Sequence, residues 1–539
     1  MRGAIVASML ASLSCATGSG TTPSSPQTST GPRTRAERTG YLETSHYADV
    51  VAFLDSLKGR PELSFGVIGK TNEGRDIPYV VASRPRISTP EEARRFGRPV
   101  VYIQGNIHAG EVEGKEALLA VLRDLTSSSR PNALDSVVLI AVPIYNADGN
   151  ERFASQEVNR GSQNGPVMVG VRANAQNLDL NRDYMKAEAP ETRASLDMFN
   201  KWDPDVFVDL HTTNGSYHGY ALTYAPALNP AAPLAVYSRD SIMPVLRQRM
   251  QARHNFATFD YGDFISADTL SKGWATFDSR PRFGTNYYGL RGRVSILSEA
   301  YSHDPFERRV KSTEAFIREI LSLVGERGGR WRFLPVSGSV TSAVAGPGSV
   351  HLQSEMVAAP ESVPVVAEIM ERTGDSARTE PGVPKGRRRT GRFVTVNMPV
   401  YERFKPTLTV KSPAGYIIPA ADTQVVRVIR QHGIIVDPVP SAYQAGVEIF
   451  HVDSTVVAAR PFQGHREMRL TGSWRTEQVT VPAGAYFVRV NQPLGLLAVY
   501  LLEPQSDDGL VTWNYFDRHL RPGGTYPVLK TQLPIGMVQ

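Results

Sequence analysis

Four short segments of the chain carry side chains that could together build one metal site. They are His108-Ala109-Gly110-Glu111, Asn181-Arg182, Asp209-Leu210-His211 and Ser298-Glu299. The first places an imidazole and a carboxylate three residues apart, and the third adds a second imidazole 100 residues after Glu111. Two nitrogens and one carboxylate, with a fourth position left for water, are the ligands of a hydrolytic zinc centre. Structural zinc sites favour thiolates, and the chain has a single cysteine, so the pattern indicates chemistry.

Three of these segments follow or end short apolar runs that are typical of buried parallel strands. The runs are residues 99–103 before His108, 206–210 before His211 and 294–297 before Glu299. In open α/β sheets, ligands bind outside the carboxyl ends of the strands. We therefore expect the polar side chains at these three strand ends to meet in one crevice.

In their order along the chain, the segments resemble those of the zinc carboxypeptidase family, the carboxypeptidase A-like metallopeptidases. The resemblance covers about residues 40–330 and runs from HxxE through an arginine, Asn-Arg and Asp-Leu-His to a late glutamate. Its most specific part is the stretch 172–184, RANAQNLDLNRDY. The resemblance implies an α/β fold, with a mixed, mostly parallel sheet flanked by helices.

The resemblance also implies a role for each residue of the metal site. His108, Glu111 and His211 would bind one zinc ion per chain. Glu299 would be the general base, which takes a proton from the water that attacks the substrate carbonyl. Bound zinc lowers the pKa of water to about 7, so a carboxylate can complete the activation near neutral pH.

Three further residues would handle the substrate. Arg172 corresponds to the arginine that stabilises the developing oxyanion. Asn181 and Arg182 correspond to the pair that holds the terminal carboxylate, and a guanidinium suits this task because it can donate two parallel hydrogen bonds. Asp209, just before a ligand, is expected to support the site and not to bind the metal.

The family also uses a tyrosine that closes over the substrate, and its position in this chain is open. Tyr287 and Tyr288 are the first candidates, Tyr217 and Tyr220 are alternatives, and all four could instead be packing aromatics. The side-chain pocket is equally open. Three arginines near it would favour acidic substrate ends or could be surface residues: Arg282, Arg291 and Arg293.

The amino-terminal segment predicts export. An apolar stretch precedes Cys15, so residues 1–15 resemble a bacterial lipoprotein signal, although Ser12 stands where leucine is usual. Residues 16–38, rich in Ser, Thr, Gly and Pro, suit a flexible tether. We expect a periplasmic or outer-membrane lipoprotein, or a secreted protein, that meets a membrane only through a lipid on Cys15.

Composition agrees with a large enzyme that has more than one core. The chain has 539 residues, 41% of them hydrophobic and 21% charged, and a net charge of +6. Without a run of about 18 apolar residues, a transmembrane helix is not expected. Nucleic acid is a poor partner for an exported protein of this charge. The densest basic run, 385–392, predicts a solvated loop.

The local patterns divide the chain near residue 335. Residues 39–335 alternate helical and strand patterns and form the predicted catalytic domain, whose last helix should begin with Asp304 as its cap. Within it, residues 146–150 predict a turn. Residues 336–539 contain short strands between prolines and glycines, including 497–502, and predict a β-rich accessory region.

These observations favour a zinc-dependent metallocarboxypeptidase that acts on peptides with a free terminal carboxylate. A first alternative is a zinc amidase or peptidase that acts on peptidoglycan stem peptides, and it would have less need of Arg182. A second alternative is a catalytically inactive peptide-binding protein. That alternative predicts the loss of a ligand or of Glu299, and none of these residues is missing.

Overall fold

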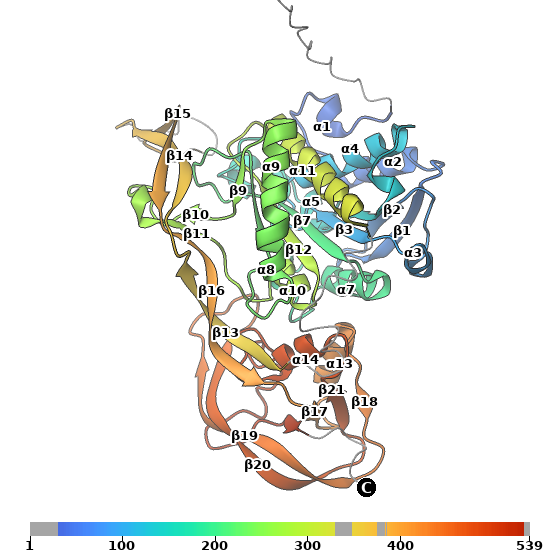
Figure 1. Cartoon of the computed structure of the whole chain (residues 1–539), viewed down its shortest axis with the longest axis vertical. Helices are drawn as coiled ribbons and strands as arrows, with labels where there is room; N and C mark the ends of the chain where they lie inside the picture. The colour runs from blue at the N-terminus through green and yellow to red at the C-terminus, as the bar shows by residue number, and fades with distance from the viewer. Residues whose placement is uncertain (1–30, 329–347, 375–382, 384, 533–539) are drawn as a thin grey trace, which may run out of the picture.

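The structure is a computed structural model that describes most of the chain (Figure 1). The described residues are 31–328, 348–374, 383 and 385–532. The predicted signal segment 1–15 with Cys15, most of the predicted tether and the predicted domain boundary near residue 335 lie outside them. In the described part of the chain, no helix combines the length and apolar character needed to cross a membrane.

The last residues of the predicted tether are folded against the catalytic domain. Helix α1 (Arg35–Arg38) is capped by the side chain of Thr34. Within it Ala36 is fully buried, and Glu37 contacts the guanidinium of Arg123 at 2.6 Å. Residues 31–38 therefore belong to the folded domain, and their capped helix and ion pair replace the flexibility that their composition suggested.

The catalytic domain is built on a sheet of eight strands in the order β1-β2-β4-β3-β7-β12-β8-β9. Their bounds are β1 Leu63–Lys70, β2 Asp76–Ala82, β3 Val100–Gly105, β4 Val138–Val142, β7 Val206–Thr212, β8 Leu222–Pro226, β9 Thr258–Asp260 and β12 Val294–Ala300. The central strands β4, β3, β7 and β12 are parallel neighbours. The pairs β1–β2, β2–β4 and β12–β8 are antiparallel. The sheet is thus mixed, with a parallel centre, and the predicted fold class is confirmed.

Helices cover both faces of this sheet, which explains why its central strands are apolar throughout. The helices are α2 Tyr47–Ser56, α3 Pro90–Phe96, α4 Glu113–Ser127, α5 Ala147–Glu151, α6 Gln156–Asn159, α7 Pro190–Trp202, α8 Ala235–Tyr237, α9 Met243–His254, α10 Gly284–Leu290 and α11 Phe306–Arg327. Along β3, Val101 and Ile103 join the core under α4 and α11. Val100 and Tyr102 join the opposite core, to which α7 and α10 contribute. The alternation of side chains along each strand therefore divides the domain into two apolar layers.

Two local predictions in this domain are wrong. Residues 147–151 form the short helix α5 instead of a turn, because the side chain of Asn146 caps it by accepting a hydrogen bond from the amide of Gly149. Helix α11 begins at Phe306, and Asp304 does not cap it. The Asp304 carboxylate instead accepts a hydrogen bond from Arg308 Nε at 2.9 Å, so the ion pair replaces the expected cap.

The C-terminal region is rich in long strands, as predicted. A six-stranded sheet has the order β18-β21-β17-β22-β19-β20, and β14 pairs with β15. The bounds are β13 Ser349–Ala358, β14 Val363–Arg372, β15 Arg387–Met398, β16 Val400–Lys411, β17 Gly415–Ile418, β18 Asp437–Pro438, β19 Tyr443–Val457, β20 Met468–Val481, β21 Tyr486–Arg489 and β22 Leu529–Thr531, with helices α13 Thr423–Gln431 and α14 Gly495–Leu502.

Two segments of this region differ from their predictions. Residues 497–502 lie in helix α14 and not in a strand, since a short apolar run buried on every side has no periodicity that separates the two structures. The basic run 385–392 is mostly the start of strand β15 and not a loop. Its arginines are paired with carboxylates, among them Arg389 with Glu368 at 2.8 Å and Arg388 with Glu371 at 2.6 Å.

The catalytic domain and the C-terminal region share one β-sheet and one apolar core. Strands β10 (Asp263–Phe264) and β11 (Trp274–Ala275) of the catalytic domain continue a sheet formed by β16 and β13. Figure 1 shows β17 to β21 with α13 and α14, in orange and red, below α7 and α10, whereas β14 and β15 lie beside the catalytic domain near β10 and β11. One apolar core contains residues from both parts, for example Phe199 and Tyr287 together with Ile429 and Leu501. The C-terminal region is therefore a continuation of the catalytic domain's core.

Candidate active site

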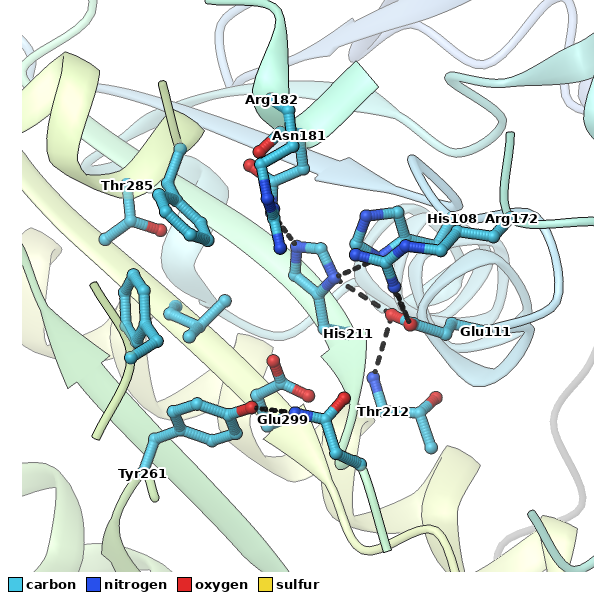
Figure 2. Close-up of a pocket in the computed structure, with 14 residues that line it drawn as sticks. His108, Glu111, Arg172, Asn181, Arg182, His211, Thr212, Tyr261, Thr285 and Glu299 are labelled. Carbon is cyan, nitrogen blue, oxygen red and sulfur yellow. Dashed lines mark hydrogen bonds and ion pairs between the residues drawn. The ribbon is translucent and has the colours of Figure 1, made fainter. Parts of the chain in front are cut away.

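His108, Glu111 and His211 meet at the carboxyl ends of β3 and β7 (Figure 2). His108 Nδ1 lies 3.1 Å from His211 Nδ1 and 3.1 Å from Glu111 Oε1, and His211 Nδ1 lies 2.9 Å from Glu111 Oε2. All three side chains are buried, and their ligand atoms lie within 4.8 Å of one another. Two imidazole nitrogens and a carboxylate fit a divalent cation of the zinc type. Among the described residues, this is the only such group of three.

Close backbone contacts hold the turn that carries His108 and Glu111. A side chain at Gly110 would place its Cβ 2.6 Å from Arg160 Cγ and 2.9 Å from the carbonyl oxygen of Gly170. A side chain at Gly114, in the first turn of α4, would come 2.7 Å from Leu210 Cβ. The glycines let the turn and α4 approach β7 closely, and this approach brings Glu111 to His211.

A carboxylate holds the far nitrogen of each imidazole. Asp179 Oδ1 lies 3.1 Å from His108 Nε2, and Asp209 Oδ2 lies 3.0 Å from His211 Nε2. These contacts turn both Nδ1 atoms toward the centre. Gln104 Nε2 donates to Asp209 Oδ1 at 3.1 Å, so this carboxylate is itself held in place. Asp209 supports the site in the way predicted.

Two arginines surround the Glu111 carboxylate. Arg160 Nη1 lies 3.0 Å and Arg172 Nη1 3.4 Å from Glu111 Oε1. Burial raises the pKa of the Glu111 carboxyl, but His108 and Arg160 more than offset this and hold it well below its usual range. Glu111 is therefore an anion that is ready to bind a cation. Sequence reasoning missed Arg160, because it lies outside the four motifs and no spacing marks it.

Glu299 lies on the neighbouring strand and faces the same cavity. In the parallel pair of β12 and β7, Glu299 is directly opposite His211. Its Oε2 is buried and has no hydrogen-bond partner. Burial raises the pKa of Glu299 to about 8, with Glu111 adding to the rise and His211 opposing it. The carboxyl is thus basic and free to exchange a proton with a molecule in the cavity.

Arg172, Asn181 and Arg182 form one polar side of a cavity of about 130 Å³. Arg172 Nε donates to Asp179 Oδ2 at 2.9 Å. The guanidinium of Arg182 lies 3.9 Å above the Phe283 ring and donates to the carbonyl oxygen of Asn181. Stacking and this single bond leave other guanidinium donors for a ligand. Two arginines here can therefore bind an anionic group beside the metal ligands.

The remaining wall of the cavity is largely apolar. It contains Tyr261, Phe277, Phe283, Thr285 and Leu297. The rings form a continuous row, with centroids 5.8 Å apart for Tyr261 and Phe277 and 5.1 Å apart for Phe277 and Phe283. Figure 2 shows Thr285 and Tyr261 across the cavity from His108 and Glu111. The polar and apolar halves of the cavity thus face each other.

The prediction that Tyr287 and Tyr288 contact substrate is wrong. Both are fully buried in helix α10. The Tyr287 hydroxyl bonds His432 Nδ1 at 2.7 Å, and that of Tyr288 lies 3.2 Å from Ser195 Oγ. All residues of this helix are buried against the sheet, and the burial of apolar surface places both aromatic rings in the core.

The alternatives Tyr217 and Tyr220 do not line the cavity either. Tyr217 stacks on His303 and Tyr220 on Phe259, with centroid distances of 4.1 Å and 4.7 Å. The tyrosine that does line the cavity is Tyr261, whose hydroxyl accepts a hydrogen bond from Asn214 Nδ2 at 2.6 Å. Sequence reasoning missed Tyr261 because it follows β9 in a loop without motif spacing.

The three arginines considered for the side-chain pocket lie outside the cavity, so the expected preference for acidic ends has no support. Arg282 is buried and paired with Asp508 at 2.7 Å. Arg291 donates to the Tyr287 hydroxyl at 3.2 Å, and Arg293 pairs with Asp203. Each arginine is already neutralised or hydrogen-bonded within the protein.

Several known proteins resemble parts of this chain. Residues 50–267 match the family model described as zinc carboxypeptidase. Carboxypeptidase 2 of Trichophyton tonsurans is 23% identical over 491 residues, covering 86% of this chain and 82% of that protein. Carboxypeptidase Z of Mus musculus is 33% identical over 124 residues, 22% of this chain and 17% of that protein. A metallo-carboxypeptidase from Burkholderia cenocepacia aligns with a TM-score of 0.39 at 19% identity, covering 52% of this chain and 70% of that one.

The fold and the matched segment indicate a hydrolase whose residues 50–267 are similar to the zinc carboxypeptidase family. A C-terminal β-rich region is attached to the matched domain. The family match ends at residue 267, before Glu299. The place of Glu299 in the site therefore rests on the pairing of β12 with β7 and on its side chain in the cavity.

The support that Asp209 gives to His211 can be tested by metal affinity. Asp209→Asn should lower the affinity for zinc by about 10- to 100-fold, because the amide lacks the carboxylate charge that faces the imidazole Nε2 at 3.0 Å. Competition with a chromogenic chelator measures this directly. Asp203→Asn is the matched control, since Asp203 lies at the end of α7 with φ 48°, a conformation that asparagine also adopts. Equal zinc affinities for all three proteins would show that Asp209 does not support the metal site.

Proposed function

We propose that this protein is a zinc-dependent metallocarboxypeptidase, with His108, Glu111 and His211 holding one zinc ion. The observation that carries the proposal is that one cavity contains these three ligands, an unpartnered Glu299 and two arginines. When bound there, zinc would supply a Lewis acid that polarises the scissile carbonyl and acidifies water. A catalytically inactive protein would have no need to keep a buried carboxyl without a partner.

Glu299 carries the protons of the reaction in this proposal. As a water molecule attacks the peptide carbonyl, its proton passes to the Glu299 carboxylate and the new C–O bond forms. The C–N bond then breaks, and Glu299 returns the proton to the leaving amine. The raised pKa of Glu299 supports this role, because it allows the group both to accept and to return a proton near neutral pH.

Arg172 and Arg182 divide the negative charges of the substrate between them. Arg172 lies beside Glu111, near the metal ligands, and would stabilise the oxyanion that forms during attack. Arg182, stacked on Phe283, would hold the terminal carboxylate with two parallel hydrogen bonds, helped by Asn181. The position of Arg182 in the same cavity favours an exopeptidase over an amidase that cuts internal bonds, such as one acting on peptidoglycan.

The apolar wall indicates which terminal residues fit. Apart from the ligands, Glu299 and the two arginines, the cavity lining contains no charged side chain. A terminal residue whose carboxylate meets Arg182 would place its side chain against Phe277, Phe283 and Leu297. Burial of apolar surface there favours aromatic and large aliphatic ends, and the wall offers no partner to a lysine or an acidic side chain.

Export by a bacterial cell remains part of the proposal. Its support is the apolar stretch before Cys15 together with the Ser-, Thr-, Gly- and Pro-rich composition that follows. Lipidation of Cys15 would place the enzyme at a membrane surface, and cleavage without lipidation would release it. In either case its substrates would be peptides outside the cytoplasm.

Replacing the proposed base separates chemistry from metal binding. Glu299→Gln should retain zinc and lower kcat by between about 100-fold and about 10,000-fold, because the amide cannot accept the proton. Hydrolysis of a peptide with a terminal phenylalanine, followed with a zinc assay, measures both. Glu307→Gln, at an exposed glutamate in the first turn of α11, is the control. Near-normal turnover by Glu299→Gln would assign the base to another group.

The carboxylate clamp predicts a dependence on the end of the peptide. Arg182→Met keeps an apolar stem on Phe283 and removes the guanidinium, so kcat/KM for free-acid peptides should fall at least about 30-fold. Mass spectrometry of paired free and amidated peptides gives this comparison, with Arg308→Ala as the exposed control. If the wild-type enzyme cuts both forms equally, the amidase alternative is preferred.

A charge placed in the apolar wall should change the preferred terminal residue. Thr285 lies at the second position of α10, where an aspartate is favoured by the helix dipole. Thr285→Asp should lower kcat/KM for phenylalanine ends relative to lysine ends by at least about tenfold. A mixed peptide library reports the ratio, and Thr407→Asp on the exposed face of β16 is the control. An unchanged ratio would mean that the side chain of the substrate binds elsewhere.

A further inference from the structure

Several groups of the site depend on one residue, Asp179. Its Oδ1 lies 3.1 Å from His108 Nε2, and its Oδ2 accepts from Arg172 Nε at 2.9 Å. Its carbonyl oxygen accepts from the amide of Arg182 at 2.9 Å, and its Oδ1 also accepts from the amide of Asn181 at 2.9 Å. A metal ligand, the oxyanion arginine and the carboxylate clamp therefore all move if Asp179 moves.

The amide of Asp179 is held by a residue from the far end of the chain. Gln463 Oε1 accepts a hydrogen bond from Asp179 N at 2.8 Å, across 284 residues of sequence. Gln463 belongs to the C-terminal region, between β19 and β20. One side-chain amide of this region thus completes the hydrogen bonding of the residue that organises the catalytic site.

Gln463 has the positive φ that its turn requires, in a residue type that rarely adopts it. Phe462 and His465 exchange two backbone hydrogen bonds, of 2.7 Å and 3.0 Å, around Gln463 and Gly464. Both central residues have positive φ, 50° and 83°, as in a type I′ turn. Asparagine, aspartate and glycine suit the first position, whereas glutamine rarely adopts this conformation. A glutamine kept there points to a task for its longer side chain.

Other contacts fix this turn against both walls of the site. His465 Nε2 lies 3.0 Å from both carboxylate oxygens of Glu188, on the segment that follows Arg182. The Phe462 ring lies under the guanidinium of Arg282 at 5.3 Å, and Arg282 also pairs with Glu467 at 2.6 Å. Arg282 directly precedes Phe283, on which Arg182 stacks. The turn is therefore held rigidly where it can position Asp179.

We propose that Gln463 is a positioning residue of the catalytic site, through which the C-terminal region fixes Asp179 and, with it, His108 and Arg172. The C-terminal region is then a working part of the active site and not a separate accessory module. The inference deepens the proposed function and rests on it for the catalytic readout. Its effect on metal affinity can be measured whether or not the chain trims peptides.

Gln463→Asn in the full-length chain separates positioning from structure. Asparagine suits the turn better than glutamine but is one methylene too short to reach the Asp179 amide. We expect an unchanged or higher Tm, together with an about tenfold loss in zinc affinity and in kcat/KM, the latter mainly in kcat. Zinc affinity is measured by chelator competition, and kcat and KM with a free-acid peptide.

Two further variants complete the test. Gln463→Glu keeps the length and the accepting oxygen, so its zinc affinity should stay within about twofold of wild type. Gln444→Asn, at an exposed glutamine of β19 that bonds Thr480, is the matched control and should change neither quantity. Wild-type zinc affinity in Gln463→Asn would overturn the proposal. A lower Tm in Gln463→Asn that Gln463→Glu does not restore would overturn it as well, because it would reveal a purely structural role.

Discussion

Two buried imidazoles can share a cation only if each turns a nitrogen inward, and this requirement governs the site. The orientation of both rings is fixed, because Asp179 and Asp209 contact their outer nitrogens. Asp209 comes fixed within a buried strand, between neighbours on both sides. Asp179 lies in a loop and has no such support of its own. Contacts from distant segments fix the position of Asp179, just as the buried strand fixes the position of Asp209.

The strongest parts of the fold and site were predictable because they depend on local patterns. Apolar runs that end in polar residues mark parallel strands, and the ends of such strands meet by geometry, so the metal ligands and Glu299 could be placed together in advance. Residues 146–150 and 497–502 were assigned wrongly because a side-chain cap and complete burial decided their structure. The burial of 497–502 cannot be seen in a window of a few residues, whereas Asn146 is a favoured cap residue whose local signal the turn pattern masked.

The rest of the site depends on contacts between segments that the sequence does not relate. Tyr261 and Phe277 reach the cavity from loops, and Arg160 reaches Glu111 from a segment without a motif. Tyr287 and Tyr288 were candidates for substrate contact because they precede Glu299, yet their helix packs on the sheet and takes both rings into the core. Loop residues near a motif are therefore poor candidates without knowledge of which face of each element is buried.

The pairing of Glu299 with His211 in adjacent parallel strands has a consequence for how such an enzyme can vary. The spacing of neighbouring strands is a constant of the β-sheet, about 4.8 Å, and no change in loop length can alter it. The sheet thus sets the distance between Glu299 and His211. The loops that bring Tyr261, Phe277 and Phe283 to the cavity are not constrained by the spacing of the strands. Changes in these loops can therefore alter which substrates fit the cavity, while the distance between Glu299 and His211 stays the same.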